Sequence, residues 1–289
     1  MSYARVSSPR ATLASLGFCA LTLLAISCGG KRVTLPSGPG TPSSDAVAAY
    51  AEATRECRGV QSLTASLSLS GRAGSTKLAA RIDAGFAAPG RLRLEGYPRI
   101  AFGGRPFFIL VADGADTTLV LTRDNRVLRG AAPSAIIEAL TGIALAPDDL
   151  RALTAGCGFA AGEPGDGRSF DAGWTSVQSG PATIFLRRVE NRWRVAGARR
   201  GSVQVVYSDF AGTRPASVRL HTNQDAGVVP SDLSIHISQF ETNAALGTAV
   251  FSVDVPKDAV PLTLDELQKA GPLGGATEKT KSGDGSGDE

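Results

Sequence analysis

The chain has 289 residues, of which 43% are hydrophobic, 20% charged and 6% aromatic, and its mean hydropathy is +0.02. These values exclude a disordered polymer and a polytopic membrane protein, so most of the chain is expected to fold in water. Of the 30 basic side chains two precede residue 28 and no acidic one does, so removal of residues 1–27 leaves 28 basic against 27 acidic side chains. A nearly neutral body of this kind is not built to neutralise nucleic-acid phosphates, and we expect no nucleic-acid partner.

The first 28 residues are typical of a bacterial export signal. Residues 1–10 carry two arginines, and an apolar run follows at 11–27. The segment 23–28, Leu-Leu-Ala-Ile-Ser-Cys, resembles the lipobox of bacterial lipoproteins, which implies cleavage before Cys28 and lipid attachment to that cysteine. Two or three acyl chains make such an anchor stable. The alternatives are an uncleaved signal anchor and an ordinary cleaved signal peptide.

Composition divides the rest of the chain into three parts. Residues 28–44 are rich in Gly, Pro, Ser and Thr, and are expected to form a flexible tether behind the lipidated Cys28. Residues 274–289 are polar and low in complexity, and are expected to be disordered. The folded domain is therefore predicted at 45–273. Gly29 stands in place of the aspartate that marks inner-membrane retention in enterobacterial lipoproteins, which favours the outer membrane, facing the periplasm.

Apolar spacing predicts one helix, a run of strands and then two short helices. The helix is predicted at 45–58, where Ser43 or Ser44 can cap it. The first strands alternate between apolar and polar residues, with a turn predicted at 71–75. Strands are predicted at 63–69, 78–84, 91–96, 107–112, 117–122 and 126–129. The short helices, 133–141 and 147–154, each begin with Pro and end before Gly, and they are expected to cover the concave face of the sheet as a helical lid.

A second series of strands follows the two short helices. Strands are predicted at 169–177, 182–188, 192–198, 203–208, 217–222, 233–240 and 250–255, and a final helix at 265–270. No change in composition separates the two series, so one curved sheet is expected rather than two domains. The predicted class is α+β, mostly β, with a single unclosed antiparallel β-barrel, an N-terminal helix and a helical lid.

The lid region carries a family resemblance. Residues 140–145, Leu-Thr-Gly-Ile-Ala-Leu, followed by Leu150-Arg151 and Gly156, resemble the lid of the outer-membrane lipoprotein receptor LolB and the LolA and LolB-like carriers. The order of helix, strands, helical lid and further strands is also similar, and the resemblance covers 62–156 well. It implies an unclosed barrel that binds acyl chains of lipids or lipoproteins beneath the lid. It also implies transfer at the outer membrane, with a periplasmic carrier protein as a possible partner.

The resemblance implies a set of lipid-binding side chains on the sheet and the lid. An empty pocket of ~500 Å³ would cost about 12 kcal/mol at ~24 cal/mol per Å³, so such a cavity must fill with lipid or partly collapse. The alternative interpretation is that the same residues form a plain core. The candidates are Leu67, Leu69, Ile82, Leu92, Leu94, Ile109, Val111, Ile136, Ile137 and Leu140.

The loop at 96–104 is a candidate membrane-contacting segment. The family resemblance implies an apolar residue on a loop after the third strand that helps to deliver cargo. Ile100 and Phe102 are the candidates for that position here. The alternative is a wide loop whose two apolar side chains fold back onto the core.

Two cysteines remain in the exported body once Cys19 leaves with the signal and Cys28 is lipidated. Disulfides persist outside the cytoplasm, so Cys57 and Cys157 are predicted to pair and to tie the first helix to the end of the lid. The alternative is two thiols that lie too far apart.

Other charged residues support binding more than catalysis. Residues 187–200 hold six arginines and one acid, a stripe that phosphate headgroups or an acidic partner could use, although a solvated outer face also explains it. His221 and His236 are the only histidines and do not form a metal-binding pair. No nucleophile elbow, Walker loop or dinucleotide fingerprint occurs in the sequence. We therefore expect no enzyme activity, no metal and no cofactor.

The sequence leaves two hypotheses. The first is a monomeric outer-membrane lipoprotein, anchored by Cys28, that binds acyl chains and transfers lipids or lipoproteins. The second is a non-enzymatic lipoprotein with a filled core that acts in envelope scaffolding or assembly.

Overall fold

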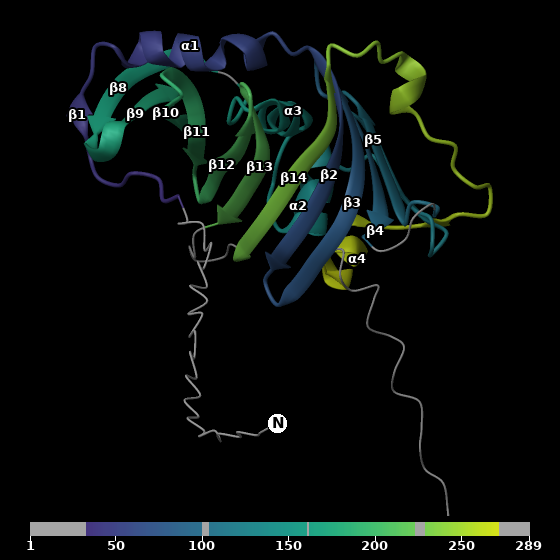
Figure 1. Cartoon of the computed structure of the whole chain (residues 1–289). Coiled ribbons are helices and arrows are strands. Elements are labelled where there is room, and N and C mark those ends of the chain that lie inside the picture. The colour runs from purple at the N-terminus through teal and green to yellow at the C-terminus, as the bar shows by residue number, and fades with distance from the viewer. Residues whose placement is uncertain (1–32, 100–103, 161, 223–228, 272–289) are drawn as a thin grey trace, which may run out of the picture. The chain divides into compact units, whose positions relative to one another are not determined.

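The computed structural model describes residues 33–99, 104–160, 162–222 and 229–271 (Figure 1). The chain divides into two units, Met1–Val33 and Thr34–Glu289. Val33 is the one described residue of the first unit, and it is exposed. All the helices and strands below belong to the second unit. No described helix is long and apolar enough to cross a membrane.

The strands of the described residues form a single sheet with fifteen members. The first series is β2 Ser62–Ala73, β3 Thr76–Ala87, β4 Arg91–Pro98, β5 Phe108–Asp113, β6 Asp116–Leu121 and β7 Arg126–Arg129. The second series is β8 Pro164–Phe170, β9 Trp174–Ser179, β10 Ala182–Val189, β11 Arg192–Arg200, β12 Val203–Ala211, β13 Arg214–Thr222 and β14 Ser231–Thr242. Two short strands, β1 Thr41–Pro42 and β15 Val260–Pro261, lie at the sheet edges.

The two series join where β14 pairs antiparallel with β2, from Ser231 opposite Ala73 onward. The strand order is β1-β8-β9-β10-β11-β12-β13-β14-β2-β3-β4-β5-β6-β7-β15. All neighbouring strands are antiparallel except the β7–β15 pair, and β1 and β15 do not pair with each other. The sheet is therefore curved but unclosed (Figure 1), and the predicted fold class is confirmed.

In the described part of the chain four α-helices accompany the sheet: α1 Ala46–Arg58, α2 Pro133–Thr141, α3 Pro147–Ala155 and α4 Leu264–Ala270. α1 packs on β8, β9, β10 and β11 (Figure 1). α2 and α3 begin with proline and end at Gly142 and Gly156, whose φ angles of 76° and 89° suit glycine best. α3 packs on β2, β3, β4 and β13, so residues 133–155 cover the concave face and are called the lid below.

Part of the segment 28–44, which was predicted to be a flexible tether, is docked on the sheet. Leu35 is buried against the outer face of the sheet, and Thr41–Pro42 pairs with β8. Leu35 fits there because the facing residue is Gly197, where a β-carbon would lie 2.6 Å from a Leu35 methyl group. A single apolar residue in a Gly- and Pro-rich segment gives no periodic signal, so this docking was not predicted. The helix cap also differs, because Asp45 rather than a serine precedes α1.

Three strand predictions need correction. The turn predicted at 71–75 is shorter than expected, because β2 continues to Ala73. Gly71 therefore lies within the strand, where it permits the close approach of β14. A β-carbon at Gly71 would lie 2.1 Å from the Asp232 carbonyl oxygen. The predicted strand 169–177 is interrupted by a turn at Asp171–Gly173. Residues 250–255, predicted as a strand, pair with no strand of the described chain, and a 3₁₀ turn, Thr248–Phe251, places buried Phe251 under the Arg91 guanidinium.

The C-terminal segment holds the edge of the sheet beside the lid. After β15 pairs with β7, Thr263 caps α4 by accepting a hydrogen bond from the Glu266 backbone NH, and α4 packs on α2. Hydrogen bonds from Thr263 and Arg126 lower the pKa of Glu266 to about 2. The Glu266 carboxylate of the folded protein is therefore ionised at neutral pH.

The predicted disulfide is present: Cys57 in the last turn of α1 is bonded to Cys157, just beyond α3, with 5.6 Å between their Cα atoms. The loop that it closes spans 100 residues. The bond therefore ties the N-terminal helix to the end of the lid across the intervening strands.

Replacement of both cysteines, Cys57→Ser with Cys157→Ser, is expected to lower the free energy of unfolding by about 2 to 5 kcal/mol, because the unfolded chain loses a long covalent loop. Urea denaturation of the mature protein with and without reductant measures the loss. Reductant should not change the stability of the double variant. Two reactive thiols in unreduced, denatured wild-type protein would contradict the pairing.

Candidate functional site

An apolar cavity of about 80 Å³ lies between the concave face of the sheet and the lid. All of its lining residues are apolar except Thr141 and Thr154. The sheet contributes Leu67, Leu69, Ile82, Phe86, Leu94, Phe108, Val218, Leu220, Leu233, Ile235 and Ile237. The lid contributes Ile137, Leu140, Thr141, Ile143, Leu145, Leu150, Leu153 and Thr154.

Most of the predicted lipid-binding residues line this cavity. Those that do are Leu67, Leu69, Ile82, Leu94, Ile137 and Leu140. Leu92 and Ile136 are fully buried in the same apolar core but do not line the cavity. Leu92 and Ile136 are therefore ordinary core residues, which is the alternative that the sequence also allowed.

The predicted placement of Ile109 and Val111 in the lining is wrong. In the β4–β5 register they lie opposite Glu95 and Arg93, whereas Leu110 lies opposite Leu94, which lines the cavity. Successive side chains of a strand point to opposite faces, so Ile109 and Val111 belong to the outer face. The run from Phe107 to Val111 is continuously apolar, and such a run contains no alternation from which the inward face could be read.

Part of the lining comes from the second series of strands and was not predicted from the sequence. Val218, Leu220, Leu233, Ile235 and Ile237 alternate with polar residues, which is a signal for half-buried strands. The alternation predicts that these side chains share the buried face of a sheet, but it does not predict which cavity or core that face covers. The β14–β2 pairing decides it, because it closes the second series around the same lid.

The cavity is far smaller than the pocket considered from the sequence. At ~24 cal/mol per Å³ an empty volume of 80 Å³ costs about 2 kcal/mol, which a domain of this size tolerates. The described structure is therefore the partly collapsed alternative, in which the lid side chains occupy most of the concave interior.

An ion pair between buried Asp149 and partly exposed Arg200 fixes α3 to the sheet. Asp149 is 4% exposed, and its carboxylate accepts hydrogen bonds from both terminal nitrogens of Arg200 on β11, at 2.8 and 2.6 Å. The same carboxylate accepts the Ala160 backbone NH at 3.1 Å. The Arg200 guanidinium also lies 4.2 Å from the centre of the Phe159 ring. These directional contacts define one closed position of the lid.

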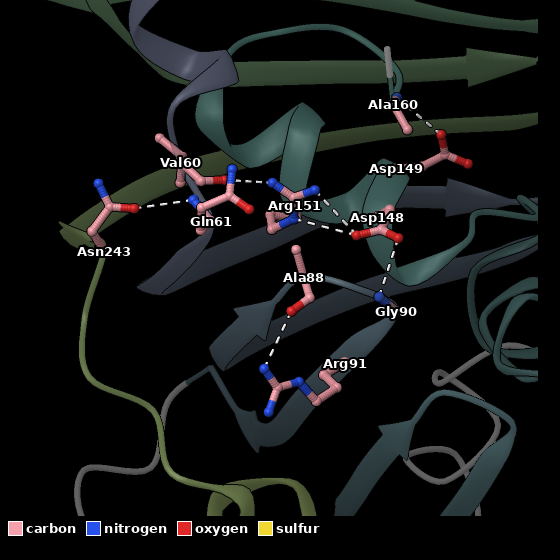
Figure 2. A network of polar contacts seen from close by, with 10 residues as sticks. All are labelled: Val60, Gln61, Ala88, Gly90, Arg91, Asp148, Asp149, Arg151, Ala160 and Asn243. Carbon is pink, nitrogen blue, oxygen red and sulfur yellow. Dashed lines mark hydrogen bonds and ion pairs between the residues drawn. The ribbon is translucent and has the colours of Figure 1, made fainter. Parts of the chain in front are cut away.

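A second set of polar contacts holds the start of α3 (Figure 2). Asp148 accepts a hydrogen bond from the Gly90 backbone NH at 3.1 Å and forms an ion pair with Arg151 at 3.1 Å. Arg151 in turn donates to the Val60 carbonyl oxygen. The lid is thus connected to the turn between β3 and β4 and to the chain that precedes β2.

Tyr207 on β12 holds the end of α3. Its hydroxyl donates to the Leu153 carbonyl oxygen at 2.9 Å and accepts the Gly158 backbone NH at 3.0 Å. Burial raises the pKa of the Tyr207 phenol above its usual range. The hydroxyl therefore remains protonated and keeps its donor at any physiological pH.

Several predicted site residues cannot be placed. Cys28, Ile100 and Phe102 lie outside the described residues. Within the described ranges no group of three or more His, Cys, Asp or Glu side chains is arranged to hold a metal ion.

No protein-family model and no curated protein matches the sequence. Solved structures with a similar chain path include a LolA superfamily protein from Nitrosomonas europaea, 13% identical, with a TM-score of 0.49 over 72% of this chain and 98% of that chain. A DUF1329 family protein from Desulfovibrio piger is 12% identical, with a TM-score of 0.45 over 73% and 98%. The Mycobacterium tuberculosis lipoprotein LppX is 11% identical, with a TM-score of 0.29 over 74% and 100%. These values assign no family, so the function below is inferred from the geometry of this chain.

The substitution Arg200→Gln is expected to destabilise the protein by about 2 to 3 kcal/mol, because it leaves the buried Asp149 carboxylate without its ionic partner, whereas the Ala160 NH still donates to that carboxylate. Urea denaturation measures the loss, and hydrogen exchange should show faster exchange of the α3 amides.

Arg219→Gln is the matched control. It removes a similar two-bond ion pair with Asp232, whose side chain is 50% exposed, so less than about 1 kcal/mol should be lost. Equal losses in the two variants, or unchanged exchange of α3 in Arg200→Gln, would contradict the proposed role of Arg200.

Proposed function

We propose that this chain is a membrane-anchored lipoprotein of the bacterial envelope that binds acyl chains beneath the lid and carries lipids or lipoproteins to the outer membrane. The observation that supports the proposal is the cavity, which is lined by apolar residues except for two threonines and is bounded on one side by two short helices. The resemblance of residues 140–156 to the LolB lid agrees with it.

An acyl chain needs more room than the cavity has in its closed form. A dry cavity of about 150 Å³ accommodates a benzene molecule. The cavity of about 80 Å³ is therefore too small for a fatty chain until the lid moves outward. Burial of a chain of sixteen carbons would contribute about 12 kcal/mol at ~0.8 kcal/mol per CH₂, which is enough to offset the loss of several lid contacts.

The lid can move without loss of the sheet. Apolar contacts are not directional, so Ile137 and Leu140 of α2 can exchange contacts with the sheet for contacts with an acyl chain. The directional contacts of Asp148, Asp149 and Tyr207 are few and lie around α3. A fatty chain would thus enter most readily beside α2, with α3 held in place.

The remaining parts of the proposal concern the membrane. Cys28 would carry the lipid anchor, and Ile100 and Phe102 would contact the bilayer during delivery. A periplasmic carrier protein would supply the cargo, and the protein would act as a monomer without catalysis.

The alternative function is a non-enzymatic scaffolding or assembly lipoprotein with a filled core. The small volume of the cavity favours this alternative, because most of the interior is already occupied by side chains. The two functions differ in one measurable property, the uptake of a lipid beyond the modification at Cys28.

Native mass spectrometry of the mature protein after gentle extraction tests the proposal. A bound lipid in addition to the Cys28 modification, or uptake of lipid after incubation with a labelled lipoprotein, is the expected result. A body that remains free of lipid in both measurements would support the scaffolding alternative.

The substitution Ile82→Trp is expected to reduce the affinity for a fluorescent fatty acid at least tenfold, because a larger ring would occupy the cavity. Ile109→Trp is the matched control: it makes the same exchange on a nearby strand but on the outer face, and its affinity should stay within twofold of wild type. Thermal unfolding verifies that both variants fold. Similar affinities in the two variants would place the fatty acid elsewhere.

A further inference from the structure

A second hollow, here called the α1 groove, has a volume of about 940 Å³ and lies along α1. It exists because β11 pairs with β12 only between Gly197 and Arg200, where it meets Val203–Val206. Beyond this short pairing the two strands separate (Figure 1), and α1 lies over their separated ends. The groove is thus an opening in the wall of the sheet.

The charges in the groove are unequal. Arginines at positions 55, 192, 194 and 214 line it, against the two carboxylates of Glu52 and Glu56. None of these six side chains takes part in an ion pair within the described part of the chain. Glu52 accepts a hydrogen bond from the Trp193 backbone NH at 3.0 Å. The groove therefore has an excess of two positive charges.

Two of the arginines are held in place without an anionic partner. Arg194 is 8% exposed, and its buried Nε makes no hydrogen bond to any described residue. A buried Nη1 of Arg214 also lacks a partner among these residues, and its guanidinium stacks 4.5 Å from the centre of the Phe240 ring. A buried cationic donor without a partner costs free energy, and an anion with several acceptor oxygens would satisfy it.

The groove lies next to the apolar cavity. Leu153 and Thr154 of α3 line the cavity, and Ala155 and Gly156, which follow them, line the groove. A molecule with an apolar tail in the cavity could therefore place a polar head at this end of α3.

We propose that the α1 groove binds a phosphate group through Arg194 and Arg214. This inference rests on the proposed function in one respect: it assigns the phosphate to the headgroup of a phospholipid whose acyl chains occupy the cavity. Phosphate fits because guanidinium groups bind its oxygens through paired hydrogen bonds, and because its charge matches the excess in the groove. Free phosphate has the same chemistry and is distinguished by the test.

Trp193 lines the groove and reports on its occupation. The chain has two tryptophans, so Trp174→Phe leaves Trp193 as the single fluorophore. The mature Trp174→Phe protein is titrated with inorganic phosphate, with a phosphatidylglycerol and with a diacylglycerol that has the same acyl chains but no phosphate. Phosphatidylglycerol is expected to bind at least tenfold more tightly than the diacylglycerol.

The double substitution Arg194→Gln with Arg214→Gln, made in the same background, should remove that tenfold difference and leave the affinity for the diacylglycerol within twofold. Arg123→Gln, on an exposed arginine that does not line the groove, is the control and should change neither affinity. Thermal unfolding verifies that each variant folds, and Arg214→Gln alone is used if the buried Arg194 cannot be replaced.

The outcomes separate the two proposals. Equal affinities for the two lipids, or equal losses for both in the double variant, overturn the phosphate site and leave the acyl cavity intact. If neither lipid binds but inorganic phosphate gives a saturable change in Trp193 fluorescence that the double variant lacks, the site stands with free phosphate as its ligand and the proposed function fails. If no ligand changes the fluorescence or binds, both proposals are wrong.

Discussion

The backbone pairing between β14 and β2 joins the two series of strands around one interior. Its register sets Ile235 opposite Leu69 and Ile237 opposite Leu67, and all four side chains line the same cavity. Without this pairing each series would be a separate sheet with an exposed apolar face. The strands can approach closely because Gly71 has no side chain where β14 passes. The concave surface, the lid position and the cavity all depend on this contact between residues that lie far apart in the sequence.

Two kinds of interaction hold the lid, and they have different consequences. Apolar packing of α2 and α3 against the sheet reduces the cavity to about 80 Å³ and does not specify a single arrangement. The bonds of Asp149 with Arg200 and of Tyr207 with Leu153 are directional and specify how α3 lies on the sheet. The disulfide adds a covalent tie at the end of α3. The fold therefore restrains α3 more firmly than α2, which packs on α4 and in the apolar core without an ion pair among the described residues.

The cavity and the α1 groove differ in the chemical groups that they can bind. The cavity offers almost no hydrogen bonds, so it suits hydrocarbon, whereas the groove presents guanidinium groups that lack anionic partners. Consecutive residues at the end of α3 line the two, and Cys57 of the disulfide also lines the groove. An amphiphile with an anionic head matches both surfaces at once, and the covalent tie keeps the two surfaces adjacent.

The sequence by itself determined the helices, most of the strands and the disulfide that an exported protein can form. The prolines and glycines around 133–156 predicted the two lid helices, alternation predicted most strands, and the cysteines left after export predicted the Cys57–Cys157 bond. Only the tertiary structure decided that Ile109 and Val111 face outward, that Leu35 docks on Gly197 and that the interior is nearly full. The reason is that periodicity and capping are encoded within a few neighbouring residues. The face that a uniformly apolar strand buries, and the volume that remains, depend on partners brought together from distant parts of the chain.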